Sequence, residues 1–155
     1  MKFRFKYTPT TLDLWKLSMR SIYSSMVGVV NIIFTLAMIG LVVRFWMEAK
    51  TIYRLLMILG ISLFTLIQPM VIYRKSKGQI EAIPKGMEIG FDDRGIHIIT
   101  SLKTSRIRWK EVKRVMKMNN MVIILMISNQ GFIITDEMVG GQKEDFYKFL
   151  DSKTG

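Results

Sequence analysis

The chain has 155 residues, half of them hydrophobic, and its formal net charge is +11. It contains no cysteine and one histidine, which excludes disulfides, thiolate metal sites, a cysteine nucleophile and a histidine-rich metal site. The positive charge alone would suggest a nucleic-acid partner. However, many of the basic residues flank two long uncharged runs, a distribution typical of membrane proteins, so no nucleic-acid partner is expected.

The chain begins with an alternation of basic and aromatic side chains over residues 2–7. Period-two alternation predicts a half-buried strand, assigned here to residues 1–8. An isolated strand is not stable in water, so we expect this strand to join the sheet of the C-terminal domain. Residues 10–20 then place Leu12, Trp15 and Met19 at helical spacing, which predicts a short amphipathic helix at a membrane interface.

Two uncharged runs follow, Ser21–Val43 and Leu55–Tyr73, and each lies between two arginines. Each is close in length to the roughly 20 apolar residues that a transmembrane helix needs. We therefore predict transmembrane helices over residues 21–46 and 53–73, followed by a polar exit linker at 74–78. Neither run contains Asp, Glu, Lys, Arg or His, which argues against a transport path because such paths need ionisable groups.

Basic residues are more frequent before the first run and after the second than in the loop between them. This bias predicts that both termini lie on the cytoplasmic side. Asn31 and Gln68 are the only side-chain amides within the two runs, and both fall in the cytoplasmic half of the hairpin. We predict a hydrogen bond between them, worth about 1 kcal/mol.

From residue 79 the pattern changes to short apolar segments separated by turn residues, followed by one amphipathic helix at Gln142–Leu150. This order predicts a single α+β soluble domain over residues 79–155, beside the membrane helical hairpin. Its strands are predicted at Glu88–Phe91, Ile96–Thr100, Arg106–Trp109, Met121–Ile127 and Phe132–Thr135.

Several of these segments resemble one known family. Ile89–Ile96 resembles the strand-turn-strand of YcxB-like proteins, and Ile107–Val115 resembles their tryptophan-containing block. The opening Phe3–Thr8, the strand Gly131–Ile134 and the helix Phe146–Leu150 also fall where that family has them. The resemblance implies a multi-pass protein of the bacterial cytoplasmic membrane with two helices and a PH-like domain: a bent antiparallel sheet or partial barrel capped by a C-terminal helix. It implies no settled biochemical activity.

The segment from residue 103 to residue 117 is strongly basic, with Glu111 as its only acid. The alternation of Arg106, Arg108 and Lys110 predicts that these three share one face of a strand. Such a face is either simply solvated or binds anionic lipid headgroups or an acidic protein partner, at about 1 kcal/mol per basic residue near a membrane surface. The candidate binding residues are Lys103, Arg106, Arg108, Lys110, Lys113, Arg114 and Lys117.

No catalytic constellation is evident. Asp92-Asp93 precedes Arg94-Gly95, a composition that predicts a turn rather than a carboxylate pair. His97 lies between two isoleucines with no Ser, Asp or Cys set expected beside it, and is predicted to be a strand-face residue. Phosphate-loop patterns are absent. We therefore expect no catalytic residue, no metal, no cofactor and no enzymatic activity.

The sequence as a whole predicts a non-enzymatic, membrane-anchored PH-like module that binds a protein partner or anionic lipid at the inner membrane face. The alternative is an immunity protein that protects its producer against a membrane-active peptide such as a bacteriocin, because small basic two-span proteins with PH-like domains resemble such factors. Homo-oligomerisation through the small residues of the two spans stays open.

Overall fold

The computed structural model describes residues 1–128 and 130–154, and the chain divides into two compact units. The hairpin unit comprises residues 11–79. The globular unit combines residues 1–10 with the chain from residue 80 onward. The globular unit is therefore assembled from two segments that are separated in sequence by the whole hairpin unit.

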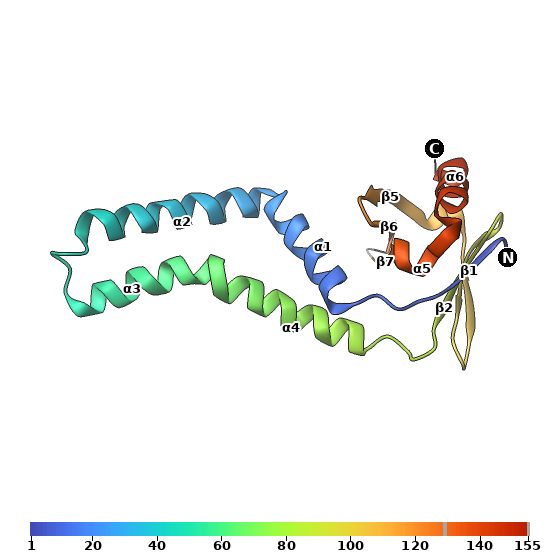
Figure 1. Ribbon diagram of the computed structural model, residues 1–155, viewed down its shortest axis with the longest axis horizontal. Helices are drawn as coiled ribbons and strands as arrows, with labels where there is room; N and C mark the ends of the chain where they lie inside the picture. The colour runs from blue at the N-terminus through green and yellow to red at the C-terminus, as the bar shows by residue number, and fades with distance from the viewer. Residues whose placement is uncertain (129, 155) are drawn as a thin grey trace. The chain divides into compact units, whose positions relative to one another are not determined.

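The hairpin unit consists of helices joined by short turns (Figure 1). Helix α2 lies beside α3, and the rod that begins with α3 continues without a break through a π-helical segment, η1, into α4. The elements are α1 (Thr11–Tyr23), α2 (Met26–Phe45), α3 (Thr51–Ser62), η1 (Leu63–Ile67) and α4 (Gln68–Glu81). By length and composition, two helices, Met26–Phe45 and Thr51–Glu81, are able to cross a membrane.

The first long helix differs from the prediction at its start. The predicted span over 21–46 contains a break, because α1 ends at Tyr23 and α2 begins at Met26. Ser25 has an extended backbone, and its hydroxyl donates to the carbonyl of Ile22 at 2.6 Å. Gly28 makes this break possible, since a Cβ there would lie 2.5 Å from the Cα of Tyr23.

The second long helix differs from the prediction at its end. Residues 74–78, predicted as an exit linker, are helical, and the helix ends only at Glu81. The change from apolar to polar composition therefore does not mark a helix end. Lys and Arg, which dominate this stretch, are good helix formers and continue the backbone hydrogen-bond pattern.

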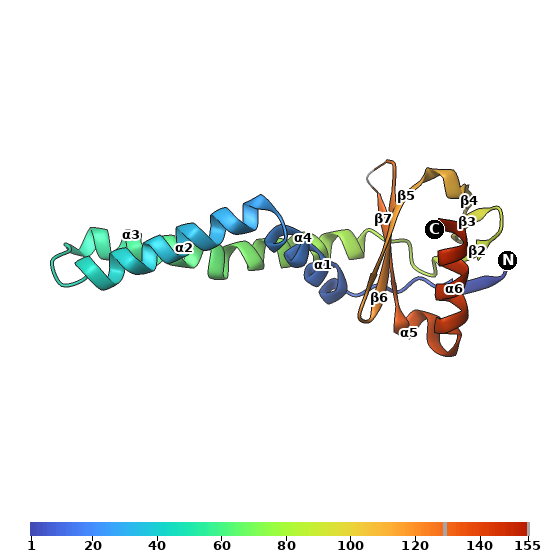
Figure 2. The same ribbon diagram turned by 90° about the horizontal axis from the view of Figure 1, so that it is seen from above.

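The globular unit contains two antiparallel sheets, and the described residues form no closed barrel. The antiparallel strands followed by a C-terminal helix agree with the prediction, and the strands are divided between two sheets. The first sheet has the strand order β1 (Phe3–Lys6), β2 (Glu88–Asp92), β3 (Gly95–Ile99), β4 (Thr104–Ile107). The second has the order β5 (Val112–Met118), β6 (Met121–Met126), β7 (Gly131–Thr135). The short helix η2 (Trp109–Glu111) connects β4 to β5. After β7, α5 (Asp136–Val139) and η3 (Gly140–Gln142) lead to the closing helix α6 (Lys143–Thr154); α5 and α6 are labelled in Figure 2.

The N-terminal strand β1 occupies an edge of the first sheet and pairs with β2. Its register joins Phe3 to Phe91 and Phe5 to Ile89. Because side chains alternate across a strand, both phenylalanines contact the core. Tyr7, just after β1, extends this contact to the second sheet, since its hydroxyl accepts the backbone N–H of Ile133 at 3.4 Å.

The core of the globular unit combines side chains from both sheets with two residues of α6. Phe146 and Leu150 are fully buried, as predicted from the amphipathic pattern of this helix. The ring of Phe146 makes edge contacts with Phe3, Phe5 and Phe91 at centroid distances of 5.5, 5.2 and 4.9 Å. Aromatic pairs in such geometry add about 0.5–1.5 kcal/mol each beyond the area they bury, so this cluster reinforces the backbone pairing that joins β1 to β2.

One strand of the second sheet has no counterpart in the prediction. Strand β5 contains a register shift between Val112 and Arg114. Such a bulge breaks the alternation of inward and outward side chains, and both Lys113 and Arg114 are exposed. The bulge is therefore the physical reason why periodicity does not reveal this strand.

Candidate functional site

The seven basic residues predicted as a binding site are called the basic surface below. They follow the chain from the β3–β4 turn through β4 and η2 into β5, and both strands are edge strands of their sheets. The predicted shared strand face is wrong. Of the three alternating residues, only Arg106 lies in β4; Arg108 precedes η2 and Lys110 lies within it.

All members of the basic surface are exposed. Two have acidic partners: Arg108 Nε lies 3.0 Å from Glu111 Oε1, and Lys117 Nζ lies 2.6 Å from a carboxylate oxygen of Asp151. The other five make no ion pair with any residue that the structure describes. These unpaired members are Lys103, Arg106, Lys110, Lys113 and Arg114. Exposed cations without a counter-charge in their own chain create a positive potential that favours an anionic ligand.

The indole ring of Trp109 lies beside this surface but belongs to the core. Trp109 is half-buried, and its Nε1 donates to the backbone carbonyl of Asp92 at 2.8 Å. The ring stacks on Phe91 at 6.4 Å and meets Phe149 edge-on at 5.9 Å. The ring therefore does not provide an exposed platform on which bases would stack.

Asp92 and His97 form a pair that the sequence analysis missed. Asp92 Oδ1 accepts the backbone N–H groups of Arg94 and Gly95 at 2.9 and 3.1 Å, which is the predicted turn. Its Oδ2 lies 2.9 Å from Nε2 of His97. Partial burial would raise the pKa of the Asp92 carboxyl, but these hydrogen bonds outweigh it and the pKa lies below its ordinary value. Antiparallel pairing of β2 with β3 could have suggested this contact. Gly90 of β2 pairs with His97 of β3, and Asp92 follows Gly90 by two residues in the same strand, so its side chain lies on the same face of the sheet.

The Asp92–His97 pair holds the β2–β3 turn in place and does not by itself constitute a reaction centre. Within the described residues, no group of three or more His, Cys, Asp and Glu side chains is placed to hold a metal ion.

Inside the hairpin unit, the two amides singled out from the sequence are in contact. Asn31 Nδ2 donates to Gln68 Oε1 at 2.9 Å, and Asn31 is only 3% exposed. The backbone carbonyl of Asn31 accepts the hydroxyl of Thr35 at 2.8 Å. The side chains of Asn31, Gln68 and Thr35 are therefore hydrogen-bonded within the hairpin unit itself.

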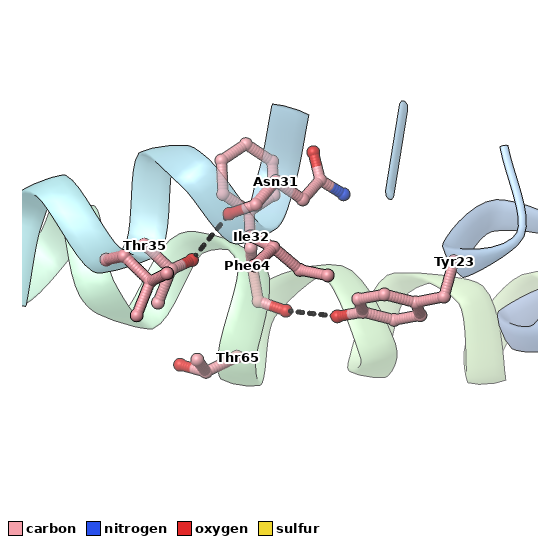
Figure 3. Close-up of a pocket in the computed structure, with 7 residues that line it drawn as sticks. Tyr23, Asn31, Ile32, Thr35, Phe64 and Thr65 are labelled. Carbon is pink, nitrogen blue, oxygen red and sulfur yellow. Dashed lines mark hydrogen bonds between the residues drawn. The ribbon is translucent and has the colours of Figure 1, made fainter. Parts of the chain in front are cut away.

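A cavity of about 170 Å³ adjoins this contact, between α2 and the π-helical segment η1 (Figure 3). In η1 the N–H of Gln68 donates to the carbonyl of Leu63, and Pro69 has no N–H to offer. The carbonyl of Phe64 instead accepts the hydroxyl of Tyr23 at 3.4 Å, which closes one end of the cavity. The cavity is lined by Tyr23, Asn31, Ile32, Thr35, Leu36, Phe64 and Thr65. The proline in an apolar run is the sequence signal for the altered backbone, although it does not indicate a cavity.

Comparison with known proteins was informative for the C-terminal part of the chain. Residues 91–150 match the YcxB-like protein family. This segment is therefore similar to a YcxB-like domain. The match confirms the resemblance predicted from the sequence, and it runs from the end of β2 into α6. No curated protein and no solved structure matches the chain.

The YcxB-like domain as matched does not contain the whole globular unit. Strand β1 and the first three residues of β2 lie outside the matched range, as does the entire hairpin unit. The two rings of β1 nevertheless pack directly on Phe146 of the matched segment. The folded unit is therefore larger than the part that sequence comparison recognises.

Proposed function

We propose that this protein is a non-enzymatic module of the bacterial cytoplasmic membrane that binds anionic lipid headgroups through its YcxB-like domain. On this proposal the hairpin unit spans the membrane, both termini are cytoplasmic, and the globular unit works at the inner face. The single observation that carries the proposal is the set of five exposed, unpaired basic residues in a chain that also carries two long apolar helices.

The membrane location is supported by the surface of the hairpin unit. Many of its large apolar side chains are exposed, including Val43 at 80%, Leu66 at 64% and Leu36 at 62%. Its buried amides are satisfied by each other, as the interior of a bilayer requires of polar groups. Such a surface would be strongly unfavourable in water and is suited to contact with lipid chains.

A PH-like architecture for the globular unit is supported by its order of elements. Seven strands form two antiparallel sheets and are followed by a C-terminal helix that contributes Phe146 and Leu150 to the core. We propose that this arrangement is a PH-like fold. It leaves the edge strands β4 and β5 on the surface, where their basic side chains are free to meet a ligand.

The expected contribution of the basic surface to lipid binding is large. Each basic residue close to an anionic membrane surface contributes about 1 kcal/mol, and the effect falls off within a Debye length of roughly 10 Å at 0.1 M salt. Even if only two of the five unpaired residues reach a headgroup at once, the gain is about 2 kcal/mol, or more than tenfold in affinity.

The proposal is tested with the purified full chain in a zwitterionic detergent and a fluorescent phosphatidylglycerol as probe. A variant with glutamine at all five unpaired positions is expected to bind this lipid at least tenfold more weakly than wild type. Binding by wild type should weaken as salt is raised, and a matched fluorescent phosphatidylcholine should bind both proteins equally. The substituted residues are Lys103, Arg106, Lys110, Lys113 and Arg114.

A charge-matched control variant replaces five basic residues outside the basic surface, and it should bind phosphatidylglycerol as wild type does. These residues are Lys16, Lys50, Lys75, Lys77 and Lys148. Equal lipid affinity of wild type and the basic-surface variant would reject lipid binding by this surface. An acidic protein would then be the remaining partner class for the five unpaired cations.

A further inference from the structure

Among the exposed apolar side chains of the globular unit, Leu102 is the least covered by its own fold. Leu102 is 96% exposed, the highest value among the large hydrophobic residues that the structure describes. Leaving a leucine in water rather than burying it forgoes about 1.5–3 kcal/mol. Single exposed leucines are common on proteins, so the surroundings of Leu102 decide whether it has a role.

The turn that carries Leu102 is held closed by three hydrogen bonds between its two ends. The backbone N–H and the hydroxyl of Thr100 both donate to the carbonyl of Lys103, at 2.9 and 2.8 Å. The backbone N–H of Lys103 donates back to the Thr100 hydroxyl at 3.1 Å. Leu102 therefore lies at the tip of a turn whose backbone is held by hydrogen bonds.

This turn lies at one particular end of the first sheet. The register aligns Lys6, Glu88, Ile99 and Thr104 across the four strands. At this end β1 stops and β2 starts, and these are the two points from which the chain leads into the hairpin unit. The Thr100–Lys103 turn connects β3 and β4 at the same end.

The charges of the two ends of the sheet differ. The end with Leu102 carries three exposed lysines, Lys6, Lys85 and Lys103, and none of them forms an ion pair with a described residue. The acid closest in register, Glu88, is already paired with Arg4. The opposite end carries the β2–β3 turn, where Asp92 and Asp93 are adjacent. Asp93 there pairs with Lys2 and Lys153 at 3.0 and 2.8 Å.

We propose that the Thr100–Lys103 turn is a membrane-inserting tip: Leu102 enters the headgroup region of an anionic bilayer while Lys6, Lys85 and Lys103 contact lipid phosphates. An apolar side chain flanked by lysines suits an interface, because the leucine leaves water and the ammonium groups stay at headgroup level. The inference rests on the proposed function in one respect, namely that the globular unit works at the inner face of a membrane.

The test uses the full chain reconstituted into liposomes and exploits the absence of native cysteine. Leu102→Cys is labelled with the environment-sensitive fluorophore NBD, in phosphatidylcholine liposomes with and without phosphatidylglycerol. With phosphatidylglycerol present, we expect a blue-shifted emission and quenching by lipids that carry a nitroxide near the headgroup. Arg94→Cys, in the exposed turn at the opposite end of the sheet, is the matched control and should show neither effect.

Two further arms separate the parts of the inference. With Lys6, Lys85 and Lys103 replaced by glutamine, quenching of the residue 102 probe should fall to the level seen without phosphatidylglycerol. Absence of quenching at residue 102 in both liposome types would overturn the tip. Quenching that is equal in both types would overturn the role of the lysines.

These outcomes differ from those that test the proposed basic surface. Lys103 belongs to both proposals, so the separating variant replaces only Arg106, Lys110, Lys113 and Arg114. Quenching at residue 102, together with unchanged lipid affinity of this variant, would reject that surface and leave the tip standing.

Discussion

Gly95 illustrates how a single residue is constrained by the neighbouring strand of its sheet. Its φ of +152° is a conformation that side chains of L-residues rarely adopt, and an added Cβ would collide with the carbonyl oxygen of Ile107 in β4. The carbonyl cannot move easily, because Ile96 and Ile107 are paired in the register of β3 with β4. The composition of the turn suggested a glycine for conformational reasons, but the close approach of β4 is visible only in the structure.

We expect Gly95→Ala to lower the free energy of unfolding of the globular unit by about 1–3 kcal/mol, the usual magnitude for backbone strain or overpacking. Denaturant unfolding of the full chain in detergent, followed by tryptophan fluorescence, would measure this. Gly141→Ala is the control, since its Cβ would meet nothing within 4 Å and its φ is not positive. The control should change stability by no more than about 0.5 kcal/mol, and equal stability of both variants would contradict the argument.

At the scale of elements, local periodicity predicted helices and strands more accurately than their ends. The apolar runs marked the helical rods, yet the break at Ser24-Ser25 and the extension to Glu81 were not predicted. Neither the break nor the extension can be predicted from amino-acid composition alone. The break needs the close packing at Gly28, and the extension needs only residues that tolerate a helix.

The Asn31–Gln68 contact provides a test of how the two long helices are held together. We expect a double-mutant cycle between Asn31→Ala and Gln68→Ala to give a coupling of about 0.6–1 kcal/mol, the range found for hydrogen bonds between helices in membranes. The coupling is measured from the unfolding free energies of the full chain in detergent. A cycle between Asn31→Ala and Ser62→Ala is the control, because the Ser62 hydroxyl bonds within its own helix, to Ile58 at 2.8 Å. Coupling no larger than in this control would show that the hydrogen bond does not stabilise the hairpin.

At the scale of the whole molecule, the decisive feature is that the globular unit includes both ends of the chain around the hairpin unit. A fragment that begins after the hairpin would lack β1, and with it the rings of Phe3 and Phe5 that contact Phe146. For this reason the experiments on lipid binding require the full chain.

Two adjacent residues of β1 test this dependence. Phe5 is 6% exposed, whereas its neighbour Lys6 is exposed to solvent. We expect Phe5→Ala to destabilise the globular unit by about 3–5 kcal/mol, the usual cost of removing a buried phenylalanine ring. Lys6→Ala should cost no more than about 0.5 kcal/mol. Limited proteolysis and denaturant unfolding of the full chain report both effects, and similar stability of the two variants would show that β1 is dispensable to the unit.

The sequence predicted which residues form the basic surface, but not how they are arranged in the fold. The net charge of residues 103–117 follows from the sequence alone, whereas the distribution of those residues over two sheets does not. Lys113 and Arg114 lie on a strand hidden from periodicity by a bulge, and Arg108 and Lys117 are paired with acids. The ion pair between Lys117 of β5 and Asp151 of α6 joins residues far apart in the chain, so no local sequence pattern predicts it.

The sequence by itself determined the two long apolar helices, the alternating strand at the N-terminus, the buried β6, the closing helix and the resemblance to the YcxB-like family. These properties are local, since each depends on the spacing of side chains within a few turns or a few strand residues. Only the tertiary structure decided the partner of β1, the division into two sheets, the Asp92–His97 pair and the placement of Leu102 among unpaired lysines. The Asp92–His97 pair depends on the register of a single hairpin. The other three depend on pairing between segments far apart in the chain, where the free energy comes from packing and hydrogen bonds that form together and not from local preference.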